Sequence, residues 1–429
     1  MAYPLASGTF YYVETSGDLE GILGSAGAGD VVVLSAGIHT LAFSTLTDIP
    51  GGVSIRGMGP EATTLHVTDP QHFVGQYACF YDLTFTTPTD AAFLLFQCEQ
   101  TAWFENVVFN CLPGLEGAPL TDETVTFKRC TFDFVTNYEA QDYGAFFDGS
   151  STAFGLYSPD GLHDGQVYFE SCLFIANPAW SNDAALTTAL YDVDGGGTGR
   201  RITFGNCTFY GRLTMSADLF GGEMRFTSCV EYNPLSTVGL MNAQEASGGD
   251  EGFYNYSQLA SNAVLQTAYT TLTQVHLHDS PSYALRNESP ARDTGGNDYI
   301  VSDHNYMYHT SGFVRSAGAF QWALESSAIY EPWYLDPADG FHLTSEDSNT
   351  SNFTDRPVIT QVNSPVDLFN HLRRIVYDIL HPSRCDMFWT LDGGIVIRSS
   401  DYQFGLTITG SAAKVFGAQT FSGVYTTEA

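Results

Sequence analysis

Pairs of carboxylates are the side chains in this sequence with the most obvious potential for chemistry. Asp160 lies four residues before Asp164, and Asp148 could lie opposite Glu170 in the folded chain. Two carboxyl groups that flank a sugar linkage can act as a general acid and as a base or nucleophile in glycoside hydrolysis. The chain holds 48 Asp and Glu residues, however, so chance proximity explains such pairs better than a catalytic site does.

The histidines show a second pattern, one that could bind a metal ion. His276 and His278 are two residues apart, and His304 lies between Asp303 and His309. On a strand, a spacing of two places both imidazoles on one face of the sheet. The pattern supplies no third ligand, which a zinc site needs. The sequence therefore predicts neither a metal site nor a bound cofactor.

A short sequence motif, which we call the phrase, repeats along the chain and would position any such groups. Each copy contains a Phe, then a polar residue, then in most copies a Cys, and then a second Phe. The clear copies begin at residues 103, 126, 168, 203 and 225, and a looser copy begins at residue 79. The first Phe residues of successive copies are 24, 23, 42, 35 and 22 residues apart, and we interpret 42 as about two units and 35 as one unit with an insertion. A period of roughly 20–25 residues suits one coil of a parallel β-solenoid, and the residue types favour strands.

The phrase also predicts a sharp bend just before its Cys. Phe127 and Cys130 would face opposite sides of a straight strand, whereas a bend between them lets Phe127, Cys130 and Phe132 all point inward. Asp, Asn or Ser, which suit tight corners, hold the bend position in five of the six copies, and Arg129 is the exception. Stacked coils would then form inner columns, with these members: Phe104, Phe127, Cys130, Phe169, Cys172, Phe204, Cys207, Phe226 and Cys229. Glu231 stands where Phe is expected, so the regular stack is expected to end there.

Several segments resemble the pectate-lyase-like right-handed β-helix superfamily. The run GDVVVLSAGIHT at 29–40 resembles its opening coil, and VSIRGMG at 53–59 resembles its second coil. The runs at 289–295 and 316–321 are similar to phrases that close such helices. The resemblance covers about residues 10–322 and implies an all-β fold, a right-handed parallel β-helix. It does not fix the activity, because this fold hosts lyases, hydrolases, epimerases, adhesins and phage tailspikes.

The resemblance also implies where a lyase site would lie. Pectate lyases of this superfamily use clustered Asp residues to bind calcium and a basic residue near the scissile bond. Asp192 and Asp194, with Arg200 and Arg201, form the one local combination of this kind. A solvated Gly-rich loop explains these residues better, since a motif needs a confirming context. The Gly-His-Gly and Arg-Ile-Lys phrases of related hydrolases are absent from the sequence.

Composition limits the partners and predicts the location. The net charge is −32, and Lys128 and Lys414 are the only lysines. This charge argues against binding nucleic acid or acidic polysaccharide through a basic face. The first residues lack the features of a signal peptide, and no apolar run approaches the roughly 18 residues of a membrane span. We therefore expect a virion protein that is made in the host cytoplasm and released by lysis.

The eight cysteines are expected to be buried thiols. Four of them occupy equivalent inner positions, where free Cys packs as a small apolar residue. The sequence has no Cys-x-x-Cys pair, which argues against a zinc or redox site. A disulfide between neighbouring coils stays an alternative.

Four regions are expected along the chain. Residues 1–28 form a lead-in and cap, 29–323 the β-helix with insertions, 324–364 a linker, and 365–429 a small α+β module. Residues 233–288 within the β-helix are expected to continue as irregular coils. The last module resembles short modules at the ends of some tailed-phage virion proteins, which implies a role in docking or oligomerisation.

The leading hypothesis is a non-enzymatic structural protein of a bacterial or archaeal virus, such as a decoration, fibre or tail-associated protein on the particle surface. It would contact other virion proteins through its C-terminal module and form a homo-oligomer, commonly a trimer in virion β-helices. Two alternatives remain: a tailspike enzyme that cleaves host polysaccharide, and a carbohydrate-binding adhesin that contacts a host surface glycan. Neither nucleic acid binding nor membrane insertion is expected.

Overall fold

The computed structural model divides the chain into two compact units, Phe10–Ala323 and a smaller one made of Leu324–Ala429 with Met1–Thr9. It describes residues 9–15, 17–44, 48–68, 73–74, 77–88, 94–97, 101–111, 113–116, 124–133, 154–157, 166–175, 190–191, 201–211, 223–232, 251–253, 255–257, 269–271, 283, 289, 304, 333–334, 341–345, 361–362, 365–383, 385–389, 395–399, 404–408 and 420–423. Within these ranges, no helix combines the length and the apolar character needed to cross a membrane.

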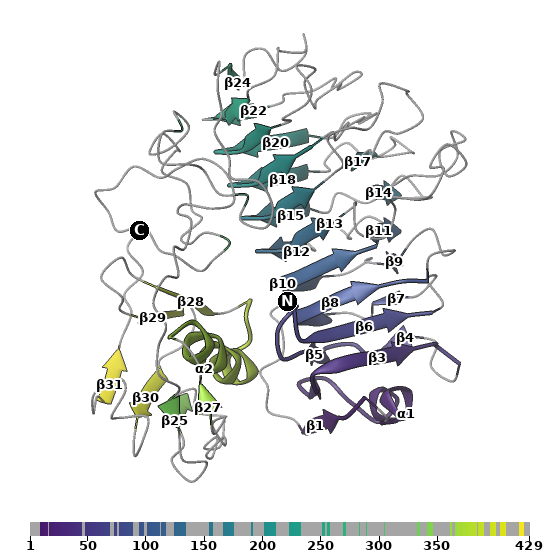
Figure 1. The fold of residues 1–429 in the computed structure, drawn as a ribbon, viewed down its shortest axis with the longest axis vertical. Helices are drawn as coiled ribbons and strands as arrows, with labels where there is room; N and C mark the ends of the chain where they lie inside the picture. The colour runs from purple at the N-terminus through teal and green to yellow at the C-terminus, as the bar shows by residue number, and fades with distance from the viewer. Residues whose placement is uncertain are drawn as a thin grey trace. The chain divides into compact units, whose positions relative to one another are not determined.

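Parallel sheets form the walls of a β-helix in the larger unit, and Figure 1 shows their strands stacked in order from β1 to β24. The first sheet contains β1 (Phe10–Val13), β2 (Val31–Leu34), β5 (Ser54–Arg56), the first parts of β8 (Cys79–Thr86) and β10 (Ala102–Asn110), β12 (Thr124–Lys128), β15 (Gln166–Glu170), β18 (Arg201–Gly205), β20 (Glu223–Thr227) and β22 (Glu251–Phe253). The second sheet contains β3 (Gly37–Leu41), β6 (Thr63–Val67), the second parts of β8 and β10, β13 (Thr131–Asp133), β16 (Leu173–Ile175), β19 (Thr208–Tyr210), β21 (Val230–Tyr232), β23 (Asn255–Ser257) and β24 (Tyr269–Thr271).

Shorter parallel strands form further pairings. These are β9 (Leu94–Gln97), β11 (Pro113–Glu116), β14 (Phe154–Tyr157) and β17 (Leu190–Tyr191) in one sheet, and β4 (Asp48–Ile49) with β7 (Phe73–Val74) in another. The parallel stack confirms the predicted all-β class and β-helix architecture. It also continues beyond Glu231, because β20 pairs with β22 and β23 pairs with β24.

A left-handed residue turns the chain at the corner between the first and second sheets. All six bend positions have φ between 50° and 58°, namely Asp82, Asn106, Arg129, Ser171, Asn206 and Ser228. Asp and Asn tolerate this region better than most residues. The turn resets the alternation of the strand, so the Phe residues before and after the corner both point into the tube.

The interior contains two stacked files of Phe rings. In the first file, the centroids of neighbouring rings are 4.8–5.3 Å apart, through Phe80, Phe104, Phe127, Phe169 and Phe204. In the second file the spacing is 4.6–5.5 Å, through Phe85, Phe109, Phe132, Phe174 and Phe209. Rings of the two files meet edge to face, an arrangement that aromatic pairs prefer. The backbone register places Phe226 beside Phe204, and the side chain of Phe226 lies outside the described residues.

The 42-residue step between copies is a single coil, which corrects the interpretation of two units. Phe127 pairs directly with Phe169, and Thr131 pairs directly with Leu173. The extra residues lie between β13 and β15 and include β14. Lengthening a loop adds little to the entropy of closing it, so one coil can carry a long insertion.

The helix α1 (Leu19–Leu23) packs into the core near the first coil. Leu19 and Leu23 are buried in the core cluster. Asp18 caps the helix, and the carboxylate of Glu20 accepts hydrogen bonds from the backbone N–H of Ala42 and from the hydroxyl of Ser44, at 3.0 and 2.8 Å. These contacts attach α1 to the end of β3 and cover the apolar residues of the first coil.

The smaller unit is an α+β fold. Its helix is α2 (Pro365–Leu380), and its antiparallel pairings are β25 (Trp333–Tyr334) with β27 (Gln361–Val362), β28 (Cys385–Trp389) with β29 (Ile395–Ser399), and β26 (Phe341–Ser345) with β30 (Phe404–Ile408) and β31 (Thr420–Gly423). Phe369, Leu372 and Val376 are buried on α2, which contacts β26, β27 and β28. Residues 324–364, expected to be a linker, therefore supply three of these strands, since their apolar residues pair with later ones.

Candidate functional site

Most of the candidates named from the sequence lie outside the described residues. These are Asp148, Asp160, Asp164, Asp192, Asp194, Arg200, His276, His278, Asp303 and His309. The backbone of Arg201 starts β18, in register between Gln166 and Glu223 on the first sheet. Glu170 ends β15, in register between Lys128 and Gly205. The carboxylate pairs and the Asp–Arg combination stay predictions.

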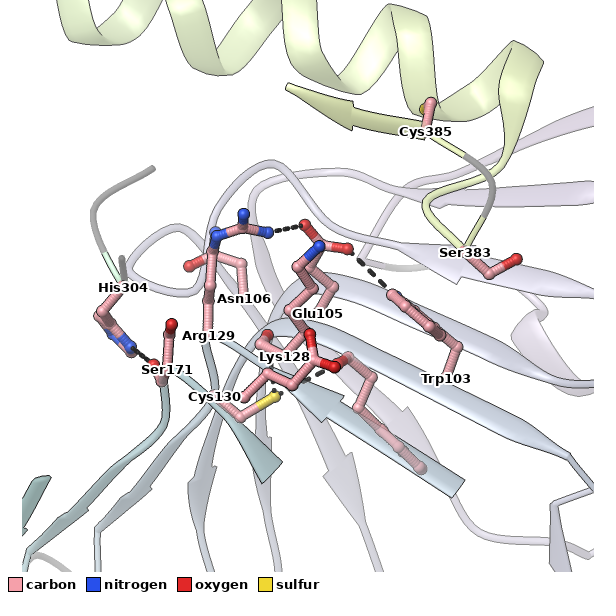
Figure 2. Close-up of polar contacts among 12 residues, drawn as sticks. Trp103, Glu105, Asn106, Lys128, Arg129, Cys130, Ser171, His304, Ser383 and Cys385 are labelled. Atoms are coloured by element: carbon pink, nitrogen blue, oxygen red, sulfur yellow. Dashed lines mark hydrogen bonds and ion pairs between the residues drawn. The ribbon is translucent and has the colours of Figure 1, made fainter. Parts of the chain in front are cut away.

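The described residues bring together a different polar group, which we call the corner cluster. It lies at the bend between the first and second sheets and contains Trp103, Glu105, Lys128, Arg129, Thr131, Ser171 and His304 (Figure 2). Trp103 and Glu105 come from β10, Lys128 from the end of β12, and Arg129 from the corner that follows it. The cluster therefore joins at least two neighbouring coils.

A buried ion pair lies at the centre of the corner cluster. Arg129 Nη1 lies 2.8 Å from Glu105 Oε1, and both side chains are 0% exposed. The second oxygen of Glu105, Oε2, accepts a hydrogen bond from the indole Nε1–H of Trp103 at 3.1 Å. Burying two charges costs free energy unless each is paired and hydrogen-bonded. Here both carboxylate oxygens have partners.

The ion pair accounts for Arg129, the exception at the bend position. Lys128 pairs in register with Glu105, so the next residue, Arg129, starts beside the preceding coil's carboxylate. Its long side chain can reach that carboxylate from the corner, as Figure 2 shows, whereas Asn, Asp or Ser would be too short. The signal in the sequence was a basic residue at a bend position that short polar residues occupy in the other copies. The partner could not be named without the register.

Lys128 lies on the outer side of the first sheet among groups that attract a cation. Its register neighbours are Glu105 on one side and Glu170 on the other. Its Nζ lies 6.0 Å from the centroid of the Trp103 ring, at the outer limit of a cation–π contact. Opposite charges on adjacent strands stabilise a sheet, so Lys128 has a structural role.

His304 contacts two neighbouring coils. Its Nδ1 lies 2.8 Å from the carbonyl oxygen of Ser171, and its Nε2 lies 3.4 Å from the hydroxyl oxygen of Thr131. A carbonyl can only accept, so Nδ1 carries the proton and Nε2 is left to accept from Thr131 in the neutral ring. Burial lowers the pKa of His304 and so does the charge of Arg129, while the hydrogen bond to Ser171 opposes this change. The sequence offered His304 as a weak metal ligand; its described contacts are hydrogen bonds.

The four phrase cysteines form a regular file just inside the corner. Each Sγ lies 3.3–3.5 Å from the carbonyl oxygen of the first Phe one coil earlier, in the pairs Cys130–Phe104, Cys172–Phe127, Cys207–Phe169 and Cys229–Phe204. All four are free and buried. Burial, with the neighbouring thiol of Cys172, raises the pKa of Cys130 and Cys207 well above that of an ordinary thiol. Cys130 and Cys207 are therefore poor nucleophiles.

The outer face of the first sheet changes in exposure along the stack. Val33, Arg56 and Tyr81 occupy outward positions in the early coils and are buried. Trp103 and Tyr168, on the later strands β10 and β15, are partly exposed. Aromatic rings in this setting can stack on sugars. Glu105 is not placed to transfer a proton to a ligand, because it is buried and its two carboxylate oxygens contact Arg129 and Trp103.

Neither a metal centre nor a known family emerges from the described residues and the comparisons. Within the described ranges, no group of three or more His, Cys, Asp or Glu side chains is arranged to hold a metal ion. No family model and no curated protein matches the chain. Among solved structures, the chain is similar to the crystal structure of pectate lyase Pel9A, with 13% identity and a TM-score of 0.31, over 74% of this chain and 98% of that one. The fold assignment rests on the strand registers given above.

Proposed function

We propose that this chain is a non-enzymatic structural protein of a virus particle, in which the β-helix acts as a rigid, exposed rod. The observation that carries the proposal is the unbroken packing of the interior. Two Phe files and one Cys file run through successive coils, and their described members are buried. In such a solenoid each coil is held by its neighbours, which gives a stiff element that can extend from a surface.

The corner cluster supports a structural role. Its charged groups are directed toward one another across neighbouring coils, as in the pair of Glu105 and Arg129. The imidazole of His304 is likewise held by Thr131 and Ser171. Side chains with these internal partners strengthen the contact between coils and are not presented to a substrate.

The proposal extends to location and partners. The protein resides on the particle after synthesis in the host cytoplasm, and its smaller α+β unit contacts other virion proteins or further copies of the chain. A homo-oligomer is part of the proposal. A separate compact unit suits this division of labour, because one unit can dock while the other projects.

Fractionation of purified particles tests the proposal. We expect mass spectrometry to find the chain in a fixed ratio to the capsid proteins, and imaging of intact particles to show it as a rod. Release of reducing ends from host polysaccharide, abolished by Asp160→Asn, Asp164→Asn or Asp192→Asn, would instead establish the tailspike enzyme.

A carbohydrate-binding adhesin is the second candidate, and one observation favours it. Trp103 and Tyr168 are partly exposed on the outer face of the first sheet, where two rings could contact sugar units. Glycan-array binding without turnover would support this function if Tyr168→Ala weakened it. Tyr12→Ala is the matched control, because Tyr12 is an exposed aromatic residue, 64% exposed, at the start of the same sheet.

A further inference from the structure

The cysteine file inside the corner places four soft ligands in a row. It has one member on each of four successive coils, namely Cys130, Cys172, Cys207 and Cys229. Backbone hydrogen bonds fix the register of the file. The N–H of the residue after each later cysteine donates to the carbonyl oxygen of the cysteine one coil earlier, at 2.9 Å. Neighbouring cysteines are therefore one strand spacing apart along the whole file.

The side chains of neighbouring cysteines also contact each other. The thiol of Cys172 forms hydrogen bonds with the thiols of Cys130 and Cys207. The thiol of Cys207 forms a further one with that of Cys229. All four residues are buried, with no more than 1% exposure. The file is therefore a continuous row of sulfur atoms inside the tube.

The spacing of the row matches the size of a metal ion held between two sulfurs. Adjacent strands are about 4.8 Å apart, so an ion midway between two sulfurs in register would lie about 2.4 Å from each. A bond between zinc and a cysteine thiolate is about 2.3 Å long. Within the described ranges, no group of three or more ligands can hold a metal ion. The file therefore suits ions that accept two ligands in a line.

We propose that the cysteine file binds soft metal ions with a full d shell, each ion between the sulfurs of two successive coils. Thiolate is a ligand that soft ions prefer. In the binding step two S–H bonds break, two metal–sulfur bonds form, and two protons pass to the solvent without a change in oxidation state. The thiols give up only weak hydrogen bonds to the Phe carbonyl oxygens.

The buried position selects the charge of the ion. Two thiolates carry two negative charges, so a divalent ion such as Hg(II) forms a neutral complex, whereas Cu(I) or Ag(I) leaves a net negative charge. An uncompensated charge in the core costs free energy. The nearest cation along the chain, Arg129, is already paired with Glu105. Hg(II) is therefore the probe that best fits the site.

Competition with a monothiol tests the proposal on the full-length chain. The folded chain is incubated with Hg(II) and a moderate excess of 2-mercaptoethanol, and native mass spectrometry counts the ions that stay bound. The competitor removes ions held by a single cysteine, while two thiolates already in place bind as one chelate. Four thiols at two per ion should hold two Hg(II) more than a variant with Ser at all four positions. X-ray absorption should find two sulfurs at about 2.4 Å from each ion.

A matched pair of double variants tests whether the two sulfurs must come from successive coils. Cys130→Ser with Cys172→Ser leaves Cys207 and Cys229 adjacent, and we expect one bound ion. Cys172→Ser with Cys229→Ser leaves Cys130 and Cys207 two coils apart, and we expect none. Each variant loses two thiols, and thermal unfolding without metal checks that both are folded. Added Hg(II) should raise the thermal midpoint of the first variant only.

Three results would overturn the proposal. They are no more Hg(II) on the parent chain than on the variant without the four thiols, equal binding by the two double variants, or a single sulfur around each ion. The measurements need only the purified chain, so their outcome does not depend on the virion assignment.

Discussion

The ion pair between Arg129 and Glu105 combines two features that are unfavourable alone. Arg129 adopts a left-handed conformation that disfavours most side chains with a Cβ, and Glu105 is fully buried. Each compensates for the other, because the corner directs Arg129 toward the carboxylate of the preceding coil. The pair is therefore expected to matter more for specifying the register between coils than for net stability.

A double-mutant cycle measures this interaction. Arg129→Asn restores the residue type of the other corners but leaves Glu105 buried without its cation, so the free energy of unfolding should fall by about 3 kcal/mol. Arg129→Asn with Glu105→Gln should recover most of that loss, as measured by urea denaturation. A single Arg129→Asn variant as stable as the parent would contradict the interpretation.

The thiol file provides a second test at the scale of residues. Burial raises the pKa of Cys130 and Cys207, and thiolate is the reactive form of cysteine. Neither residue should be alkylated by iodoacetamide at pH 8 in the native chain, whereas both should react in concentrated urea. Peptide mass spectrometry locates the label, and native labelling at either position would show that the file opens.

At the scale of elements, the Phe files hold one coil to the next. Phe169 lies between Phe127 and Phe204, with centroid distances of 5.0 and 4.8 Å. Phe169→Ala should remove both contacts and lower the free energy of unfolding by about 3–5 kcal/mol. Phe169→Leu is the control for lost volume and should cost clearly less. A Phe169→Leu variant as stable as the parent would argue against ring stacking as a source of stability, because Leu keeps most of the volume but not the ring.

The corner conformation can be tested separately from packing. Ser228 has φ of 53° and is buried, and no β-branched residue occupies any of the six corners. Ser228→Val should destabilise the stack by about 1–2 kcal/mol, because a β-branched residue resists the left-handed region. Ser228→Gly should change stability far less, since Gly adopts this conformation without steric strain. Thermal unfolding of both variants provides the comparison.

The sequence predicts these elements well where the information is local. The spacing of Phe127, Cys130 and Phe132 was enough to predict a corner and three inward side chains, and Arg129 was already recognisable as the odd residue. Its partner was not, because Glu105 becomes its neighbour only through the register of two coils. The 42-residue step was misread for the same reason. A long insertion and a missing copy look alike until Phe127 is seen beside Phe169.

At the scale of the whole molecule, contacts between distant segments escaped prediction altogether. Nothing local in the sequence relates His304 to Ser171 or Tyr283 to Tyr210. The candidates Asp160, Asp164, Asp192 and Asp194 lie outside the described residues, so they remain predictions. Overall charge, in contrast, follows from composition alone and leads to a test.

A net charge of −32 should make the stability of the chain depend on salt. Repulsion among surface carboxylates destabilises the compact state, and salt screens it over about 10 Å at 0.1 M. The thermal midpoint should therefore rise by several degrees between low salt and 0.5 M NaCl. The loss caused by Arg129→Asn should stay nearly constant across that range, because the Glu105–Arg129 pair is shielded from solvent. A thermal midpoint that falls as the salt concentration rises would contradict the idea that repulsion among surface carboxylates limits stability.

The hydrogen bonds from thiols to Phe carbonyls run in one direction along the chain. Cys130, Cys172, Cys207 and Cys229 each donate to the carbonyl oxygen of a Phe in the coil made before their own. Each completed coil therefore offers a Phe carbonyl oxygen as the acceptor for the Cys of the coil that is made after it. A polypeptide leaving the ribosome could add turns one at a time in the order of translation, starting from the end that α1 has already sealed.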